Sequence, residues 1–466
     1  MMSFERCRGR VSGFLARPLA PRAFWRATAG LVLLALLLRL LFALPALAEP
    51  STLLRPDSAS YLDPARALAA GDGLAAAPGS TESALLRPPG YPLLLALIFR
   101  LFGDALLPAA LAGCLLSATG AIPLALAGRR AAGGPAGLLA GLLWALNPTA
   151  IAQSPLFLSD NLFGVLAAWQ CYAAIRMLQR KKTADFALLA LLAIAATWVK
   201  PVNLPVVIIG LPVLALAAAD SSRQWVRFVL AAGAVFAVLL LPWWMHNYRL
   251  TGGFEANTAN IYFHNGSAVM AAVTGESSEL WRDRLIAGAE AEFRAHPERY
   301  PTIREQNAWK QRQFAAMFRQ YPLPALRTHL PHWANLLPDV PTLLENNHVS
   351  VSGRGTMAVL RQHGLFAAAD YYLDGRWYWL ILPLPLLLVT AATYGGAVIT
   401  LWRWLRRWQW RMLPVFGVLV FYYLWAPGPV ISPRYALPAL SFLIVMAAGA
   451  VGKANFTEKL HSKSEG

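Results

Sequence analysis

Charged residues are scarce in this sequence. Asp, Glu, Lys and Arg together make up 14% of the 466 residues, whereas hydrophobic residues make up 57% and the mean hydropathy is +0.45. A water-soluble domain cannot bury so large an apolar fraction in a single core, so a bilayer must be the solvent for much of the chain. Because backbone polar groups must be satisfied inside lipid, the composition predicts an all-α polytopic membrane protein.

Cysteine is also rare, and common cofactor motifs are missing. Cys7, Cys114 and Cys171 have no paired spacing and no C-x-x-C arrangement, which argues against a disulfide framework and a cysteine zinc site. The chain has no Gly-rich phosphate loop and no D-x-D carboxylate pair, so it lacks familiar means of binding a nucleotide. The sequence therefore requires no cofactor, although it leaves a divalent cation open.

Acidic residues are outnumbered, since 24 Asp and Glu face 41 Lys and Arg and the formal net charge is +17. In a membrane protein such an excess first reports orientation. Residues 1–26 contain six arginines and one acid, so we expect a cytoplasmic N-terminus and no nucleic-acid partner. The small-x-small sequence at residues 46–48 offers a signal-peptide cleavage site as an alternative, which the long basic region and the many later apolar runs disfavour.

Apolar runs near the length of roughly 20 residues that a membrane span needs recur along the chain. A shorter run, residues 91–102, contains Arg100 and suits an interfacial helix. If it does not cross, the basic clusters near Arg129, Arg180 and Arg406 all become cytoplasmic, as the positive-inside rule requires. We therefore expect about ten spans (10–12), at residues 27–48, 105–127, 133–148, 158–178, 185–199, 201–219, 227–245, 377–401, 412–426 and 434–452.

The spans divide the chain into five parts. They are a basic cytoplasmic N-terminus (1–26), an N-terminal transmembrane module (27–245) with an outer catalytic loop (49–104), a periplasmic segment (246–376), a C-terminal transmembrane module (377–452) and a cytoplasmic tail (453–466). Only the periplasmic segment has a soluble composition. Its charged stretch 279–319 is expected to be helical, with interruptions at Pro297 and Pro301, and the segment is expected to shape an acceptor cleft.

Ionisable residues gather at the outer mouths of the predicted spans. Such groups at the edge of hydrocarbon are unfavourable unless a partner or a ligand offsets their desolvation, so they indicate a functional site. One or two carboxylates beside several cations suit a reaction with an anionic leaving group and a nucleophile that must lose a proton. The group consists of Asp57, Arg87, Asp160, Lys200, His246, Arg249 and Arg434.

Structural interpretations of these residues stay open. Asp57 follows Pro56 and is also typical of a turn or a helix N-cap, and Asp160 is also typical of a residue that caps a span. Lys200 and Arg434 also suit interfacial cations that extend toward water. A metal site formed by His329 and His332 is disfavoured because Pro331 breaks the helix that would align them.

Five motifs in order resemble one known family. They are PDSxxY, GDGL, RPPGYPxLLA…FG, a P-W-x-x-x-N-Y span end and a late RYxLP, between about residues 25 and 450. The pattern is similar to bacterial GT-C glycosyltransferases, and within them to the family 39 group of protein mannosyltransferases and the lipid A aminoarabinose transferase. The resemblance implies a GT-C bundle with Asp57 as the catalytic carboxylate. It places Tyr61 on the same helical face, and Arg87 and Tyr91 in an interfacial helix at the edge of the site.

The resemblance also implies the reaction. A sugar would move, with inversion, from a polyprenyl-phosphate donor to a lipid, polysaccharide or protein acceptor at the periplasmic face of a bacterial inner membrane. Asp57 would be the general base, and partial burial would have to raise its pKa. Lys200, Arg249 and Arg434, with Arg87, would stabilise the leaving phosphate, and Tyr61, Tyr91 and Asp160 would also line the substrate site.

Two features leave room for other functions. Many members of this family have two adjacent acids at the first motif, whereas Ser58 follows Asp57 here, which weakens a two-acid or metal-binding role. A transporter or flippase of lipid-linked sugars would also need cations beside a lipid cavity, although it would more often show repeated halves, which the sequence lacks. A non-catalytic assembly protein is the second alternative, and in it Asp57 would be dispensable.

Overall fold

The structure is a computed structural model of the 466-residue chain. It describes residues 19–84, 87–252, 261–349, 356–381, 383–406 and 412–451. Most of the predicted basic N-terminus and the predicted tail 453–466 lie outside the described residues. Within the described residues the chain is helical, and the β-type pairing is an isolated bridge between Ala75 and Ser83.

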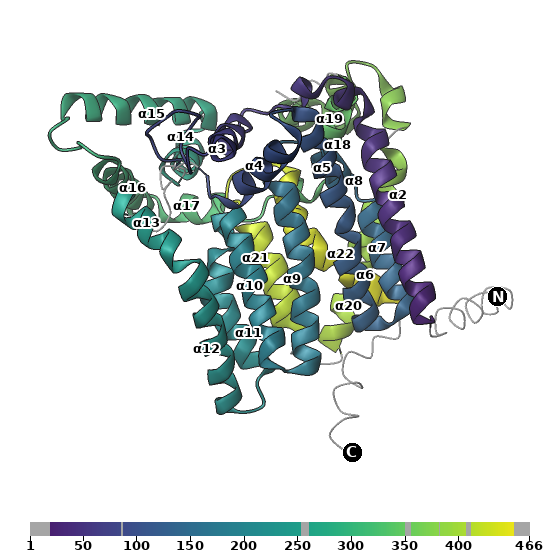
Figure 1. Cartoon of the computed structure of the whole chain (residues 1–466). Coiled ribbons are helices and arrows are strands. Elements are labelled where there is room, and N and C mark those ends of the chain that lie inside the picture. Colours follow the sequence, from purple (N-terminus) through teal and green to yellow (C-terminus); the bar gives the residue numbers. More distant parts are fainter. Residues whose placement is uncertain are drawn as a thin grey trace.

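A bundle of long apolar helices forms the centre of the molecule (Figure 1). Six segments of the described chain are long and apolar enough to cross a membrane, which confirms the predicted all-α polytopic architecture, whereas the number of about ten spans stays a prediction. The six are α2 (Pro21–Ala48), α5 with α6 (Leu106–Thr119 and Ala121–Ala132), residues 201–218 ending in α11 (Leu211–Ala218), α12 (Ser222–Leu239), α20 (Leu384–Arg406), and η8 (Pro433–Ala436) with α22 (Leu437–Val451).

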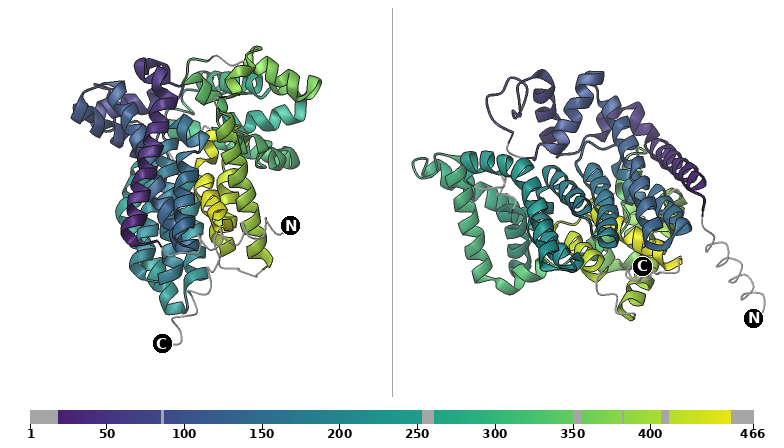
Figure 2. Two further views of the ribbon diagram at one scale, coloured as in Figure 1. Left: turned by 90° about the vertical axis from the view of Figure 1, so that its right-hand side faces the viewer. Right: turned by 60° about the horizontal axis from the view of Figure 1, so that its bottom comes forward.

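Further helices complete the bundle and cover its outer end (Figure 2). Those packed within the bundle are α7 (Gly134–Ala145), α8 (Pro148–Gln153), α9 (Asp160–Arg180), α10 (Thr183–Val199) and α21 (Leu419–Trp425). The first outer loop contains η1 (Pro50–Leu53), α3 (Ala59–Ala70) and α4 (Gly90–Phe102). The outer segment contains α13 (Leu241–Thr251), η4 (Ile261–Asn265), α14 (Gly266–Thr274), α15 (Ser278–Ala295), α16 (Ile303–Gln320), α17 (Pro322–Thr328), η5 (Trp333–Leu336), α18 (Val340–Glu345), α19 (Thr356–Leu373) and η6 (Trp377–Ile381).

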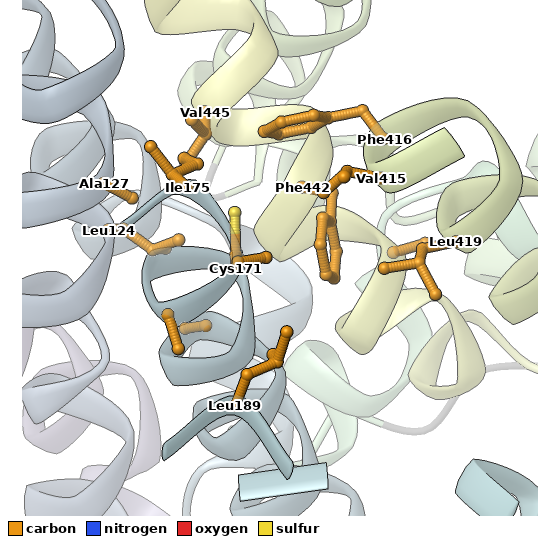
Figure 3. Packing of buried hydrophobic residues seen from close by; sticks show 14 of the residues in the cluster. Leu124, Ala127, Cys171, Ile175, Leu189, Val415, Phe416, Leu419, Phe442 and Val445 are labelled. Atoms are coloured by element: carbon orange, nitrogen blue, oxygen red, sulfur yellow. The ribbon is translucent and has the colours of Figure 1, made fainter. Parts of the chain in front are cut away.

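The main buried cluster joins the two transmembrane modules (Figure 3). Cys171 and Ile175 of α9 are buried together with Phe416 and with Phe442 of α22, so the last helices pack into the first module. Close helix approach depends on glycine, because a Cβ at Gly137 would lie 2.4 Å from the carbonyl oxygen of Ala125. This small-residue contact lets α6 and α7 pack tightly without large side chains between them.

Arg39 is fully buried in the first span and is satisfied by neighbouring oxygens rather than by an acid. Its Nε donates to Ser117 Oγ at 2.7 Å, and its terminal nitrogens donate to the carbonyls of Ala35, Trp144 and Ala145. The last two carbonyls lie at the C-terminal end of α7, where a cation is favourable. Arg39 therefore ties α2 to α5 and α7.

Replacing Arg39 with Met is expected to destabilise the bundle by about 1–3 kcal/mol, because buried carbonyls lose their donors. The melting temperature of the detergent-solubilised protein should fall. Leu37→Met is the matched control, since Leu37 lies on the same helix and is 56% exposed. Equal melting temperatures for the two variants would contradict the role of Arg39.

The basic helix ends gather on one side of the bundle. Arg129 lies 4.4 Å over the ring of Phe24 near the start of α2, and Arg130 contacts Gln179 at the end of α9. Arg403 donates to the carbonyl of Ala450, which joins the ends of α20 and α22. These ends lie opposite α3 and α4 (Figure 1), as the positive-inside argument predicts for a cytoplasmic face.

Two helix boundaries deserve comparison with the sequence. The predicted interfacial run 91–102 is α4, a helix of 13 residues that packs against α3 at the outer end of the bundle (Figure 1). The predicted span 227–245 is wrong at both ends, because α12 covers Ser222–Leu239 and a second helix, α13, begins at Leu241. Pro242 stands in the first turn of α13, where its missing N–H is tolerated, and it separates the two helices.

The outer segment is docked onto the bundle by buried polar side chains. Asp339 accepts a hydrogen bond from Gln153 of α8 at 2.6 Å, and Asn347 donates to the carbonyl of Phe42 in α2. The predicted break near Pro297 and Pro301 is confirmed, since α15 ends at Ala295 and α16 begins at Ile303. The outer segment thus lies directly above the first outer loop and the ends of the spans.

Candidate active site

Asp57 lies in the turn between η1 and α3, and its carboxylate is held by two arginines. Oδ1 accepts from Arg87 at 2.7 Å, and Oδ2 accepts from Arg434 at 3.1 Å. The interpretation of Asp57 as a helix cap is wrong, because Ser58 occupies the N-cap position and no side chain caps α3. The Asp57 side chain is 39% exposed, so the carboxylate stays accessible.

Each arginine has a second support that fixes its direction. Arg87 Nε donates to Ser60 Oγ at 2.9 Å, and its guanidinium lies 4.8 Å over the ring of Tyr61. Arg434, in η8 at the start of the last span, donates to the hydroxyl of Tyr435 at 3.1 Å. Planar guanidinium groups held in this way are suited to pairing with a carboxylate or a phosphate.

The charge state of Asp57 differs from the expectation. Partial burial by itself would raise its pKa, but Arg87 and Arg434 outweigh burial and hold the pKa below the ordinary value. The expectation that burial raises this pKa is therefore wrong for the chain as it stands. Asp57 is ionised here and is a weak base while both arginines remain paired with it.

A second acid–cation pair lies beside the first. Lys200 Nζ is 2.5 Å from Asp160 Oδ1, and both side chains are largely buried, at 15% and 5% exposure. Lys200 therefore does not extend into water as an interfacial lysine would. Its ammonium lies 4.8 Å from the ring centre of Tyr435, which also contacts Arg434, so one tyrosine touches a cation from each pair.

The two tyrosines of the first loop have different positions. Tyr61 shares a hydrogen bond with Ser159 at 2.9 Å and lies under the guanidinium of Arg87, so it belongs to the site. Tyr91 is buried behind it, with the two rings edge to face at 5.3 Å and the Tyr91 hydroxyl 3.4 Å from the carbonyl of Leu156. Tyr91 thus positions Tyr61 and does not itself face the charged groups.

The structure does not bring Arg249 into this group. Arg249 and His246 are exposed on α13, and within the described chain neither has a hydrogen bond or ion pair with Asp57, Asp160 or the other site residues. The ring of His246 stacks on Trp243 instead, at 5.7 Å. The prediction that Arg249 meets the other cations is wrong for this arrangement, because α13 leads away from the bundle axis (Figure 1).

The outer segment contributes residues that the sequence did not single out. The imidazole of His264 in η4 interacts electrostatically with Arg282, Asp57 and Arg87, and it is half-buried. Burial, with Arg282, lowers the pKa of His264, so this ring is neutral at pH 7. Asp339 interacts with Arg434 from the other side, and burial raises the pKa of this acid. No local pattern marked these residues, because they reach Asp57 only through the docking of the outer segment.

The arrangement around Asp57 does not fit a divalent cation. Both carboxylate oxygens accept from guanidinium groups, whose positive charge opposes a metal ion at the same place. His329 and His332 take part in separate contacts, the first with Asn265 and Trp425 and the second with Ala334. Among the residues that the structure describes, no three His, Cys, Asp or Glu side chains gather as a metal site.

Comparison with known families supports the resemblance drawn from the motifs. Residues 86–246 match the dolichyl-phosphate-mannose-protein mannosyltransferase family, which confirms the resemblance over that part of the chain. The matched range contains Arg87, Asp160 and Lys200, whereas Asp57 and Arg434 lie outside it. No curated protein matches the chain.

Two solved structures are similar in architecture. One is the archaeal oligosaccharyltransferase AglB from Archaeoglobus fulgidus in complex with an inhibitory peptide and a dolichol-phosphate, with 14% identity, a TM-score of 0.47 and coverage of 91% of this chain and 50% of AglB. The other is ArnT from Cupriavidus metallidurans bound to undecaprenyl phosphate, with 18% identity, a TM-score of 0.40 and coverage of 91% of this chain and 77% of ArnT. The chain thus spans about half the length of AglB.

Proposed function

We propose that this chain is an inverting glycosyltransferase that moves a sugar from a polyprenyl-phosphate-sugar donor to an acceptor at the outer face of a bacterial inner membrane. The acceptor is a lipid, a polysaccharide or a protein. The family matched by residues 86–246 supports the donor class, because its name specifies a polyprenyl-phosphate-linked sugar. Asp57 is the proposed general base, and the site faces the periplasm.

One observation carries this proposal. The Asp57 carboxylate is clamped between Arg87 of the first outer loop and Arg434 at the start of the last span. Two guanidinium groups on one accessible carboxylate form a site with surplus positive charge at the mouth of a bundle. A phosphodiester attached to a lipid chain brings the complementary charge to this place.

The same geometry gives the charges their tasks. When the donor phosphate binds, it competes with Asp57 for the arginines, and each guanidinium that turns to the phosphate leaves the carboxylate more basic. The acceptor O–H or N–H then attacks the anomeric carbon, its proton passes to Asp57, and the carbon–oxygen bond to the phosphate breaks. The departing polyprenyl phosphate is stabilised by Arg434 and Arg87, with Lys200 beside them.

The other residues hold this arrangement in place. Asp160 keeps Lys200 ionised and directed toward Tyr435, and it supplies the second carboxylate that Ser58 does not. His264 and Arg282 of the outer segment form the wall on the acceptor side, above Asp57. No step of this mechanism uses a metal ion, and the need for one is a matter for experiment.

Transfer from a defined donor tests the function. Purified protein in proteoliposomes is supplied with a radiolabelled polyprenyl-phosphate sugar and a membrane extract as acceptor. We expect label to move into acceptor material that is no longer extracted with the polyprenyl donor. Movement of intact donor across the bilayer without transfer would favour a flippase instead, and neither transfer nor movement would favour an assembly protein.

A further inference from the structure

The short helix α17 is covered by the protein on only one side. Ala325 is buried, and α17 packs against α14, whereas Leu323 and Leu326 are 54% and 58% exposed. The exposed apolar surface continues beyond the helix at Leu330 and Trp333, which are 61% and 53% exposed. These four side chains, here called the α17 patch, form an apolar surface that water does not favour.

Contacts at both ends of this region place it at the level of the membrane surface. His329, the residue after α17, lies with its ring 5.0 Å from that of Trp425, the last residue of α21 in the bundle. On the other side, α13 follows directly on the span α12 and packs against α16, the helix before α17. The patch is therefore held beside the outer ends of α12 and α21 (Figure 1).

The charges around the patch have no acidic partners. Arg319 and Arg327 are exposed, and neither forms an ion pair within the described part of the chain. Arg319 donates to the carbonyl of Ala315 in its own helix. An apolar helix face with flanking arginines and a tryptophan is the composition of a helix that lies in the membrane interface.

We propose that the α17 patch is seated in the outer leaflet of the membrane, with Arg319 and Arg327 at the phosphate groups of anionic phospholipids. The apolar side chains reach the boundary between headgroups and acyl chains. The outer segment, which has a soluble composition, is then a monolayer-bound element rather than a domain surrounded by water. It lies beside the loop that leads to Arg434.

Spin labels at single cysteines measure this depth directly. The full-length protein carries Cys7→Ser, and Cys114 and Cys171 are fully buried, so only an introduced cysteine reacts. The label is placed at Leu326→Cys in the patch or at the matched control Glu290→Cys, which is exposed on α15. Both proteins are studied in nanodiscs of phosphatidylcholine and phosphatidylglycerol.

Oxygen accessibility should exceed that of a water-soluble nickel chelate at Leu326→Cys, and the order should reverse at Glu290→Cys. The same order at both positions, with nickel dominant, would overturn the proposal. Leu323→Cys repeats the measurement on the same face if the first variant does not fold. Strong dipolar broadening between labels of two copies in one nanodisc would also overturn it, because a second chain would then cover the patch.

The role of the arginines is tested in the same experiment. Arg327→Gln should move the label at Leu326→Cys toward water in discs that contain phosphatidylglycerol, and it should have a smaller effect in discs of phosphatidylcholine alone. An equal shift in both lipids would remove anionic headgroups from the proposal. Arg312→Gln, at an exposed position on α16, is the matched control and should leave the depth unchanged.

Discussion

Sugar transfer is expected to fall by about 10²–10⁴-fold in Asp57→Asn, because the amide has nearly the shape of the carboxylate but does not accept the proton of the acceptor. The amide oxygen still accepts one hydrogen bond, so one of the two arginines keeps a partner. Initial rates of transfer from the radiolabelled polyprenyl-phosphate sugar, at equal protein in proteoliposomes, measure the effect. Undiminished transfer would remove Asp57 from the mechanism.

Asp63→Asn is the matched control for that experiment. Asp63 lies on α3, one and a half helical turns beyond Asp57, and pairs with Arg66 at 3.0 Å. Its side chain is 41% exposed, and a surface pair of this kind contributes about 0–1 kcal/mol, so transfer should change little. Donor binding by Asp57→Asn, measured separately, distinguishes a lost base from a collapsed site.

Arg434→Gln is expected to lower kcat/KM by about 10²–10³-fold, the usual effect of removing one donor that stabilises developing negative charge. Arg434 contacts Asp57 from the last span, so its loss weakens both the clamp and the stabilisation of the leaving phosphate. The control is Arg249→Gln, because Arg249 is exposed on α13 and outside the site. Equal losses in the two variants would contradict the placement of the phosphate at Arg434.

The same pair of arginines predicts a change in the pH profile. A general base acts in its ionised form, so a pKa held low by cations extends activity toward acid. In Arg87→Gln one cation is lost while partial burial, which raises the pKa of Asp57, remains. The acid limb should therefore move to higher pH, as measured by transfer rates from about pH 4 to pH 8. An unmoved limb would show that a different group titrates.

Some features of this protein are local, and the sequence predicts them well. The length and polarity of the apolar runs identify a helical membrane protein, and the short run beginning at Tyr91 identifies α4. Pro297 and Pro301 mark the break between α15 and α16, because proline cannot continue a helix at those places. The position of ionisable residues at the mouths of spans identifies Asp57, Arg87 and Arg434 as members of one site.

The partners within that site are not local, and the sequence leaves them undecided. Arg249 and Arg434 look equivalent along the chain, yet only Arg434 reaches Asp57, because Pro242 ends α12 early and α13 leads outward. His264 gains its place from the docking of the outer segment.

The sequence by itself thus determined the solvent of this protein, its helices and the residue types of its site. Only the tertiary structure decided which cation meets which acid, and therefore that the pKa of Asp57 lies below rather than above its ordinary value. The physical reason is that burial and charge pairing act on a carboxylate with opposite signs. Their balance depends on the distances between side chains from segments as far apart in the chain as Asp57 and Arg434.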